Sequence, residues 1–340
     1  MSSPLVPVFV PPLALLLAEA EKTKGAKLTP DEVLKVRDEG FCIMMSQERA
    51  RLMDLARGYK DVYPDNCWVD WHRLRNQVTG QSFLPTLVLG IVGGPDFESR
   101  CRPILDKSGV KHEFRSPDAR MVAAFRASQR GYRPSLKEED FAAIAQHASV
   151  LYILSNNFTA QQAPSVLLGF LRLGRQLLSE AGGIAIKCES SGVAHSRLAW
   201  EQMTRDAEGG FTISAQPWSV DFWLAAFRAF VQLPINSELD YYTCGLHLLG
   251  MPDLTVAKTV TFGDTTMDQK GSSQAILFEE FAEYLLAECP TGHFAPGRTF
   301  RTHSSSEIFK ASWHECTLFE EDSYFYNPFG IWRFENACLG

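Results

Sequence analysis

The sequence predicts a soluble protein of mixed α and β structure. A small, mainly helical N-terminal region precedes a central mixed sheet flanked by helices, and the C-terminal portion is rich in β-strands. Hydrophobic residues make up 45% and charged residues 21% of the 340 residues, which is typical of a chain that buries a core. Strand-like and helix-like segments alternate between residues 83 and 188. Short apolar segments separated by turn residues then occupy residues 298–335.

The N-terminal region is expected to contain short helices, an extended segment and one strand. Residues 5–12 include three prolines, which favour an extended backbone, and a helix follows over residues 13–24. Residues 29–32, Thr-Pro-Asp-Glu, have the pattern of a helix start, with Thr as the N-cap and acids in the first turn. Phe41–Met45 is a short apolar strand, and Gln47–Arg57 is a helix rich in Arg and Glu.

The middle of the chain is expected to form an α/β layer. Its apolar, strand-like segments are Phe83–Val92, Ser149–Ser155 and Ile184–Cys188. A long helix with an apolar face is expected over about 160–181. Strands that alternate with helices at this spacing favour crossover connections, so we expect the layer to be at least partly parallel.

The domain organisation follows from changes in these patterns. Residues 274–288 show a clear helical face within a C-terminal part whose pattern is otherwise α+β. We expect an N-terminal helical and loop region at residues 1–80 and a mixed α/β main domain at 81–340. A sub-boundary near 210–217 is the alternative that we consider within the main domain.

Composition and charge exclude several classes of protein. The net charge of −7 and the pI near 5.7 argue against nucleic-acid binding, because a phosphate-binding surface needs clustered Lys and Arg. Arg126, Arg130 and Arg133 come nearest to such a cluster, but three acids follow, so we interpret them as a solvated surface. No uninterrupted apolar run reaches the roughly 20 residues of a membrane span.

The cysteines and the N-terminus bear on localisation. Eight cysteines are dispersed without a repeated short spacing, which favours free thiols in a reducing compartment over a disulfide framework. The apolar residues 5–20 lack the preceding Lys or Arg of a secretory leader, and prolines interrupt them. We therefore expect a cytoplasmic protein.

A polar segment after the third strand of the layer is the main candidate for catalysis. Glu189, Ser190 and His195 would supply an acid, a nucleophile and a base, but the Gly-x-Ser-x-Gly of a hydrolase elbow lacks its first glycine here. Nucleophilic catalysis also needs the base within hydrogen-bond reach of the nucleophile. The preferred interpretation is a strand end that turns into a helix, with Ser196 as N-cap and Trp200 packed behind it.

Cys244 and His247 place a thiol and an imidazole three residues apart. A structural zinc site needs four ligands, and no second Cys/His pair of conventional spacing is present. The glycines of residues 90–94 match neither the dinucleotide fingerprint nor the P-loop. We therefore expect no metal and no cofactor, and we interpret Cys244 and His247 as residues on alternate faces of a half-buried strand.

Two groups of residues are candidates for binding a partner. Trp68 and Trp71 lie where an ordered loop leads into a short helix, and they either cap the core, which we favour, or form a contact surface. Glu320, Glu321 and Asp322 lie in an expected turn, where they could meet a basic partner.

Several stretches that together touch most of the chain share a pattern with known proteins: Phe9–Leu17 with Leu28–Asp38, Arg57–Arg75, Gly182–Ser196, Tyr241–Asp253 and Gly297–Phe300. They resemble uncharacterised bacterial proteins with domains of unknown function, found in polymorphic-toxin and type VI secretion neighbourhoods. The resemblance implies a bacterial cytosolic protein and favours an immunity or accessory role. It assigns no catalytic residue.

Two functional hypotheses follow, and a third possibility is a structural component of a larger assembly, which would show a large exposed apolar patch. The first is an immunity-like binding protein that neutralises a cognate toxin or effector through a protein–protein interface, in which aromatic residues on an acidic surface act as anchors. The alternative is a hydrolase or a metal-dependent enzyme with a site around Glu189, His195, Cys244 and His247. Geometry discriminates between the two, because the enzyme needs these side chains to converge in a concave pocket.

Overall fold

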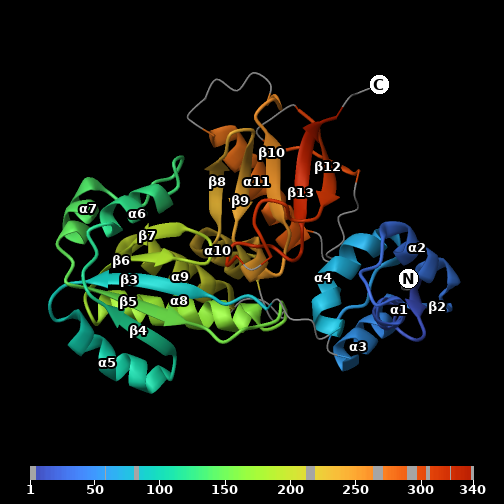
Figure 1. The fold of residues 1–340 in the computed structure, drawn as a ribbon, viewed down its shortest axis with the longest axis horizontal. Helices are drawn as coiled ribbons and strands as arrows, with labels where there is room; N and C mark the ends of the chain where they lie inside the picture. Colours follow the sequence, from blue (N-terminus) through green and yellow to red (C-terminus); the bar gives the residue numbers. More distant parts are fainter. Residues whose placement is uncertain are drawn as a thin grey trace. The chain divides into compact units, whose positions relative to one another are not determined.

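The computed structural model describes residues 5–57, 59–79, 84–211, 219–262, 271–288, 297–303, 307–321 and 323–337 (Figure 1). The described residues form two compact units, one up to Thr79 and one from Leu84 onward. They contain helices and sheets of two, five and six strands, which confirms the mixed α and β class. Residues 212–217, which make up most of the possible sub-boundary near 210–217, lie outside the described residues. None of the described helices combines the length and the apolar character needed to cross a membrane.

The first unit combines a two-stranded antiparallel sheet with short helices. Its elements in chain order are β1 (Leu5–Phe9), α1 (Leu13–Lys24), α2 (Pro30–Glu39), β2 (Cys42–Ser46), α3 (Gln47–Arg57), the 3-10 helix η1 (Pro64–Asn66) and α4 (Cys67–Thr79). The expected helix start at residues 29–32 is confirmed, because Thr29 and Glu32 each accept the backbone N–H of the other. Leu17, Val33 and Trp71 belong to the core between the helices.

Helix α1 is capped by a residue distant in the sequence. It follows Pro12, which makes no side-chain cap to the first N–H groups of the helix. The two carboxylate oxygens of Asp61 instead accept the N–H groups of Leu13 and Ala14, each at 2.9 Å. Arg57 pairs with the same carboxylate at 3.2 Å. Asp61 therefore satisfies donors that would otherwise lack a partner at the start of the helix.

The second unit begins with the five-stranded sheet. Its elements in chain order are β3 (Val88–Gly93), α5 (Phe97–Ser108), β4 (Lys111–Arg115), α6 (Met121–Ser128), α7 (Glu138–Ala145), β5 (Ser149–Leu154), α8 (Ala163–Ser179), β6 (Gly183–Cys188), β7 (Val193–Ser196) and α9 (Arg197–Phe211). The strand order is β4-β5-β3-β6-β7, and all neighbouring strands are antiparallel.

This antiparallel pairing corrects the expectation of a partly parallel layer. Helix α5 connects β3 to β4, and helix α8 connects β5 to β6, and each of these strand pairs is parallel. In both cases one strand lies between the two connected strands, β5 in the first crossover and β3 in the second. The alternation of strands and helices correctly indicated crossovers, but the two crossovers interleave, so parallel strands never become neighbours.

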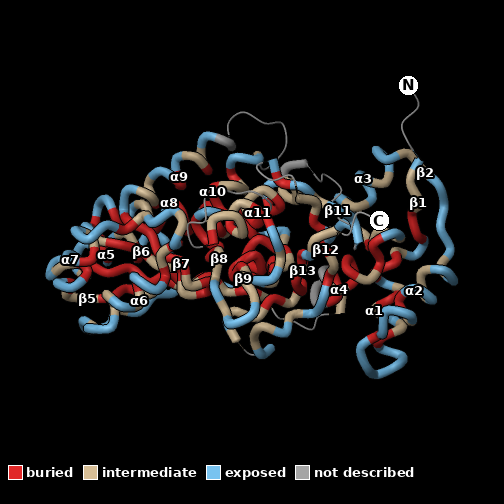
Figure 2. The backbone as a smooth tube through the Cα atoms, turned by 90° about the horizontal axis from the view of Figure 1, so that it is seen from above, coloured by how far each residue is buried: buried red, intermediate tan, exposed pale blue. Residues whose placement is uncertain are grey.

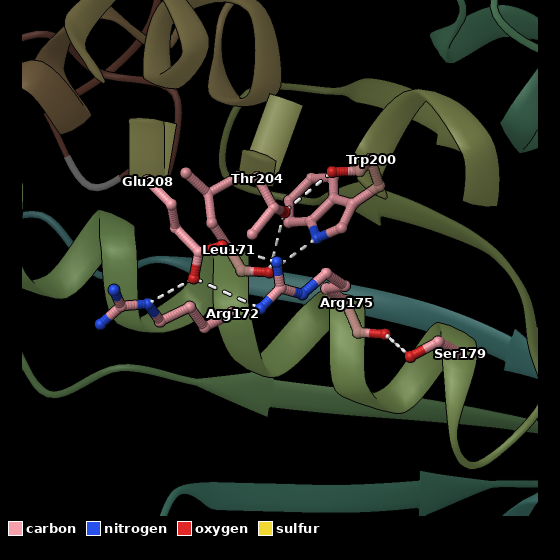
Figure 3. A network of polar contacts seen from close by, with 7 residues as sticks. All are labelled: Leu171, Arg172, Arg175, Ser179, Trp200, Thr204 and Glu208. Carbon is pink, nitrogen blue, oxygen red and sulfur yellow. Dashed lines mark hydrogen bonds and ion pairs between the residues drawn. The ribbon is translucent and has the colours of Figure 1, made fainter. Parts of the chain in front are cut away.

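Helices α8 and α9 are held together by polar contacts (Figure 3). The carbonyl oxygen of Leu171 accepts the indole N–H of the fully buried Trp200 at 3.0 Å. Glu208 of α9 bridges two arginines on α8, Arg172 at 2.9 Å and Arg175 at 2.7 Å. These contacts fix the two helices against each other, and both also pack against β6.

The rest of the second unit builds the six-stranded sheet. Its elements in chain order are α10 (Val220–Phe230), β8 (Gln232–Asn236), β9 (Asp240–Cys244), the 3-10 helix η2 (Leu246–Leu249), β10 (Asp253–Ala257), α11 (Ser272–Glu283), the π-helical turn η3 (Tyr284–Glu288), β11 (Thr299–Phe300), β12 (Phe309–His314) and β13 (Ile331–Asn336). The order is β11-β12-β13-β10-β9-β8, with one parallel pair, β10 with β13. Phe281 of α11 packs on Phe334 of β13, with ring centroids 4.7 Å apart.

Candidate functional site

The turn between β6 and β7 carries Ser190, the candidate nucleophile. Ser190 is buried, and its hydroxyl donates to the carbonyl oxygen of Thr86 at 2.8 Å. The same hydroxyl accepts the N–H of Val88 at 3.0 Å. Both hydrogen-bonding roles of the hydroxyl are used to hold this turn to the start of β3, so Ser190 has a structural role here.

Glu189 lies in a polar group on one face of the five-stranded sheet. Its Oε2 is 2.6 Å from Nζ of Lys187, and a Cβ atom added at Gly90 would meet its Oε1 at 2.9 Å. The glycine therefore leaves room for the carboxylate over the central strand. Tyr152 is the next neighbour in this group, and burial, followed by the charge of Glu189, raises its pKa. Glu189 is held as the partner of a lysine.

His195 lies on the opposite face of the same sheet. It pairs with Ile186, one residue away from Lys187, and successive residues of a strand point to opposite faces. Its Nε2 is 3.1 Å from the carbonyl oxygen of Ala229 at the end of α10. Burial, and then the cation of Arg130, lower the pKa of His195 to about 3, so the ring is neutral and donates to this carbonyl. His195 and Glu189 do not converge.

Arg130 completes the end of α10 and corrects one expectation from the sequence. Its guanidinium donates to the carbonyl oxygens of Phe227 at 3.2 Å and Arg228 at 3.0 Å, and also to that of Val231. Burial lowers the pKa of Arg130, and the favourable position of a cation at a helix C-terminus offsets this cost. Arg130 is therefore a buried capping residue rather than part of a solvated surface.

The expected helix start at Ser196 is confirmed, but β6 does not turn directly into this helix, because the chain first forms a hairpin with the short strand β7 (Val193–Ser196). The hydroxyl oxygen of Ser196 accepts the N–H of Ala199 at 3.3 Å at the start of α9. Trp200 packs behind it, with its ring centroid 5.9 Å from that of His195.

Cys244 and His247 are buried in the second unit. The expected strand ends at Cys244, because Gly245 turns the chain at a φ of 115° and His247 lies in η2. Burial raises the pKa of the Cys244 thiol well above its ordinary value and lowers the pKa of His247 to about 4. In the part of the chain that the structure describes, no group of three or more His, Cys, Asp or Glu side chains could hold a metal ion.

A buried carboxyl group that the sequence analysis missed lies beside this turn. Oδ1 of Asp253 accepts the hydroxyl of Thr243 at 2.9 Å, and Oδ2 accepts the side-chain N–H of Asn327 at 2.7 Å. Burial raises the pKa of Asp253 to about 7, although the hydrogen bonds from Asn327, Thr243 and the Leu246 N–H lower it. In the sequence, an Asp at the start of a strand is typical of a turn, so only the fold shows that Asp253 is buried and hydrogen-bonded to Thr243 and Asn327.

The residues expected to bind a partner differ in exposure. Trp71 is 1% exposed and belongs to the core of the first unit, so it offers no surface to a partner. Trp68 is partly buried, and its ring lies edge-on to that of His72 with centroids 4.2 Å apart. Glu320 and Glu321 are exposed, as a surface role requires. Asp322 lies outside the described residues.

The largest departure from ordinary burial is an apolar surface on the first unit. Of the fourteen large hydrophobic side chains that are exposed among the described residues, ten lie between residues 5 and 55: Leu5, Val10, Leu15, Leu34, Phe41, Ile43, Met44, Leu52, Met53 and Leu55. Neither β2 nor α3 contains a buried residue, and Figure 2 shows both in the colours of exposed and intermediate positions. We call Phe41, Ile43, Met44, Leu52 and Leu55 the β2–α3 surface. Because successive residues of a strand point to opposite faces, Met44 lies on the other face of β2 from Phe41 and Ile43.

The exposure of the β2–α3 surface is costly for a folded chain. Helices in proteins gain most of their stability by packing an apolar face, yet Leu52 and Leu55 of α3 are 60% and 66% exposed. Burying a side chain of this size contributes about 1.5–3 kcal/mol, so covering the surface would contribute several kcal/mol. Large exposed apolar patches mark interaction sites in soluble proteins. The exposed Arg49 and Arg51 flank these leucines on α3.

The signal for the β2–α3 surface is present in the sequence, but it is ambiguous. An uncharged strand of Phe, Cys, Ile and Met is typical of a buried strand, and its exposure depends on tertiary packing. The better signal is in Gln47–Arg57, where Leu52, Met53 and Leu55 interrupt an otherwise polar helix.

Comparison with known proteins gives no further guide to the site. No protein-family model matches the chain, and no curated protein and no solved structure resembles it significantly.

Proposed function

We propose that this protein is a binding protein that holds a protein partner through the β2–α3 surface. The concentration of exposed large hydrophobic side chains in residues 5–55 is the observation that carries this proposal. Protein interfaces combine an apolar centre with a polar rim, and Arg is favoured among the rim and anchor residues. Arg49 and Arg51 beside Leu52 and Leu55 fit a partner with an apolar groove and an acidic rim.

We infer further that the partner is a bacterial toxin or effector and that binding neutralises it in the cytoplasm. The resemblance to immunity-like bacterial proteins supports this identity of the partner, and it includes stretches of the first unit. Free thiols support a reducing compartment, because Cys42 is both exposed and unpaired and five further described cysteines are free. The proposal involves neither nucleic acid nor a membrane as a partner.

A charge placed in the surface tests the proposal. Leu55→Lys puts a cation into the β2–α3 surface, and Leu198→Lys is the matched control, because Leu198 is 72% exposed on α9 of the second unit. The wild type and both variants are used as tagged baits in native lysate, and the gene of any stoichiometric partner is then expressed alone and with each bait. We expect the wild type and Leu198→Lys to retain the partner and to restore growth, and Leu55→Lys to do neither.

Two outcomes contradict the proposal. If the retained protein does not impair growth, or if co-expression of the wild type does not relieve the impairment, the chain is not a neutraliser. If Leu55→Lys protects as well as the wild type, the β2–α3 surface is not the docking site.

A further inference from the structure

The ladder between β1 and β2 fixes which backbone groups of β2 face outward. The N–H of Val10 donates to the carbonyl oxygen of Phe41 at 3.0 Å, which makes these two residues a hydrogen-bonded pair of the ladder. Hydrogen-bonded and non-hydrogen-bonded pairs alternate in an antiparallel ladder, so Cys42 and Met44 belong to non-hydrogen-bonded pairs with β1. Their N–H and C=O groups therefore point away from β1, along the outer edge of β2.

The two outer edges of this sheet differ. Pro7 lies opposite Met44, so it also faces outward, but proline has no N–H to offer to a further strand. Natural proteins protect exposed edges with proline or charge. Residues 41–46 contain neither, and Met44 is 59% exposed. The edge of β1 is protected, and the edge of β2 is open.

A two-stranded sheet is only marginally stable by itself and gains stability from packing against helices, which β1 achieves through Phe9, or from further strands. Among the described residues, this sheet contains only β1 and β2, and β2 has no buried residue. We propose that β2 of a second copy of this chain pairs antiparallel with β2, which gives a four-stranded sheet in the order β1-β2-β2-β1. This proposal stands independently of the neutraliser function, because it concerns the strand edge and not the partner.

Charge at the two ends of β2 favours a second copy as the occupant of the edge. Glu39, at the end of α2, is exposed before the strand. After the strand, one acid, Glu48, and two bases, Arg49 and Arg51, are exposed, so this end carries a net positive charge. Antiparallel pairing brings the beginning of one β2 next to the end of the other, so the acidic end meets the basic end twice. The same surface then complements itself about a two-fold axis.

Full overlap of the two strands defines a register. Met44 lies opposite Met44 of the second copy, and Cys42 lies opposite Ser46 of the second copy. The N–H and C=O groups of all three residues point away from β1, so they form hydrogen-bonded pairs between the two copies of β2. Because Pro7 protects both outer edges, the assembly closes at two copies instead of growing into a ribbon. Edge pairing uses backbone groups, so the apolar side chains of α3 stay available to a partner.

Sedimentation equilibrium of the full chain tests this assembly. We expect the wild type to approach twice the monomer mass as its concentration rises, and Met44→Pro to remain monomeric. The N–H of residue 44 points away from β1, so proline at this position removes no hydrogen bond of the β1–β2 ladder. Leu55→Lys is the control that should still dimerise, and it separates this proposal from partner docking at α3. A wild type that stays monomeric at every concentration overturns the proposal and leaves the edge to a strand of another protein.

Disulfide trapping tests the register without relying on a proline. Hydrogen-bonded antiparallel residues lie about 5.5 Å apart between Cα atoms, within the range that a disulfide spans. Cys42→Ser/Met44→Cys should therefore form a covalent dimer on mild oxidation. The wild type should not, because the two Cys42 residues are four positions out of register, about 13 Å apart along the strand. Cross-linking through Cys42 in the wild type, or none in the double variant, would refute the register and with it this pairing of β2.

Discussion

Replacing Glu21 by leucine should destabilise the first unit by about 3 kcal/mol. Oε2 of Glu21 lies 2.7 Å from Nε of Arg75, its Oε1 accepts the N–H of Leu28 at 3.0 Å, and both charged side chains are nearly buried. Leucine keeps the volume of the side chain but leaves a guanidinium and an N–H group without their acceptor. Removing one member of a buried ion pair costs about 3–5 kcal/mol, and we take the lower end because the long Arg75 side chain can turn toward water.

Thermal unfolding and hydrogen exchange measure this effect in the full chain. A unit of this size loses about 4–8 °C in Tm per kcal/mol, so a loss of about 3 kcal/mol should lower the first transition by roughly 12–24 °C. Exchange should accelerate in peptides of α1 and α4, which carry the pair, and remain unchanged in β3 and β5. The double variant Glu21→Leu/Arg75→Met should recover most of the loss, because apolar residues can replace a buried ion pair at little cost. A cost below about 1 kcal/mol, or a double variant as unstable as the single one, would refute this account of the pair.

Three further predictions concern other buried groups. The pKa of Asp253 is raised from 3.8 to about 7 in the folded chain, so the folded state holds this proton more tightly than the unfolded state and stability falls as pH rises between these values. Each pH unit within this window lowers the free energy of unfolding by up to about 1.4 kcal/mol. Urea unfolding of Asp253→Asn should therefore show a weaker pH dependence than the wild type, and an equal pH dependence would contradict the raised pKa of Asp253. Gly245→Ala should cost on the order of 3 kcal/mol, because its Cβ would lie 2.4 Å from the carbonyl oxygen of Phe230 at a φ of 115°. Its control is Gly209→Ala on α9, where a Cβ meets no atom, and this variant should stabilise by about 0.5–1 kcal/mol in the same chemical-denaturation assay. Asp61→Ala should cost about 1–2 kcal/mol and accelerate exchange at the start of α1 and at the end of α3, where Arg57 loses a carboxylate partner. Unchanged protection of α1 would exclude the capping role.

The local signals of the sequence were sufficient for many of the elements. The helices over residues 13–24 and 47–57 begin and end where the sequence predicts them. Pro12 precedes the first of these helices and Gly25 ends it in a left-handed conformation, and both are local signals. The order of strands was not predictable in this way. We expected a partly parallel layer from the alternation of strands and helices. Whether parallel strands become neighbours depends on which strand lies between the two strands that a crossover connects, and contacts between residues far apart in the chain decide this.

The candidate site shows the same limit. Glu189 and His195 are six positions apart in the sequence, but the hairpin between them places their side chains on opposite faces of one sheet. Arg130 looks like a surface residue until α10 brings three carbonyl oxygens to it. The β2–α3 surface was missed for the opposite reason, because an apolar strand is normally evidence of burial. Only the packing of the first unit shows that β2 and α3 have no buried residue.

The interleaved crossovers have a consequence for how the chain is made. Strand β3 is synthesised first among the strands of its sheet, but its neighbours β5 and β6 begin about 60 and 95 residues later. During translation at roughly 5–20 residues per second, this uncharged strand waits several seconds with both edges unpaired. The emerging chain is therefore most vulnerable to aggregation between the synthesis of β3 and that of β6, and chaperones that protect extended apolar segments should be needed most in this interval.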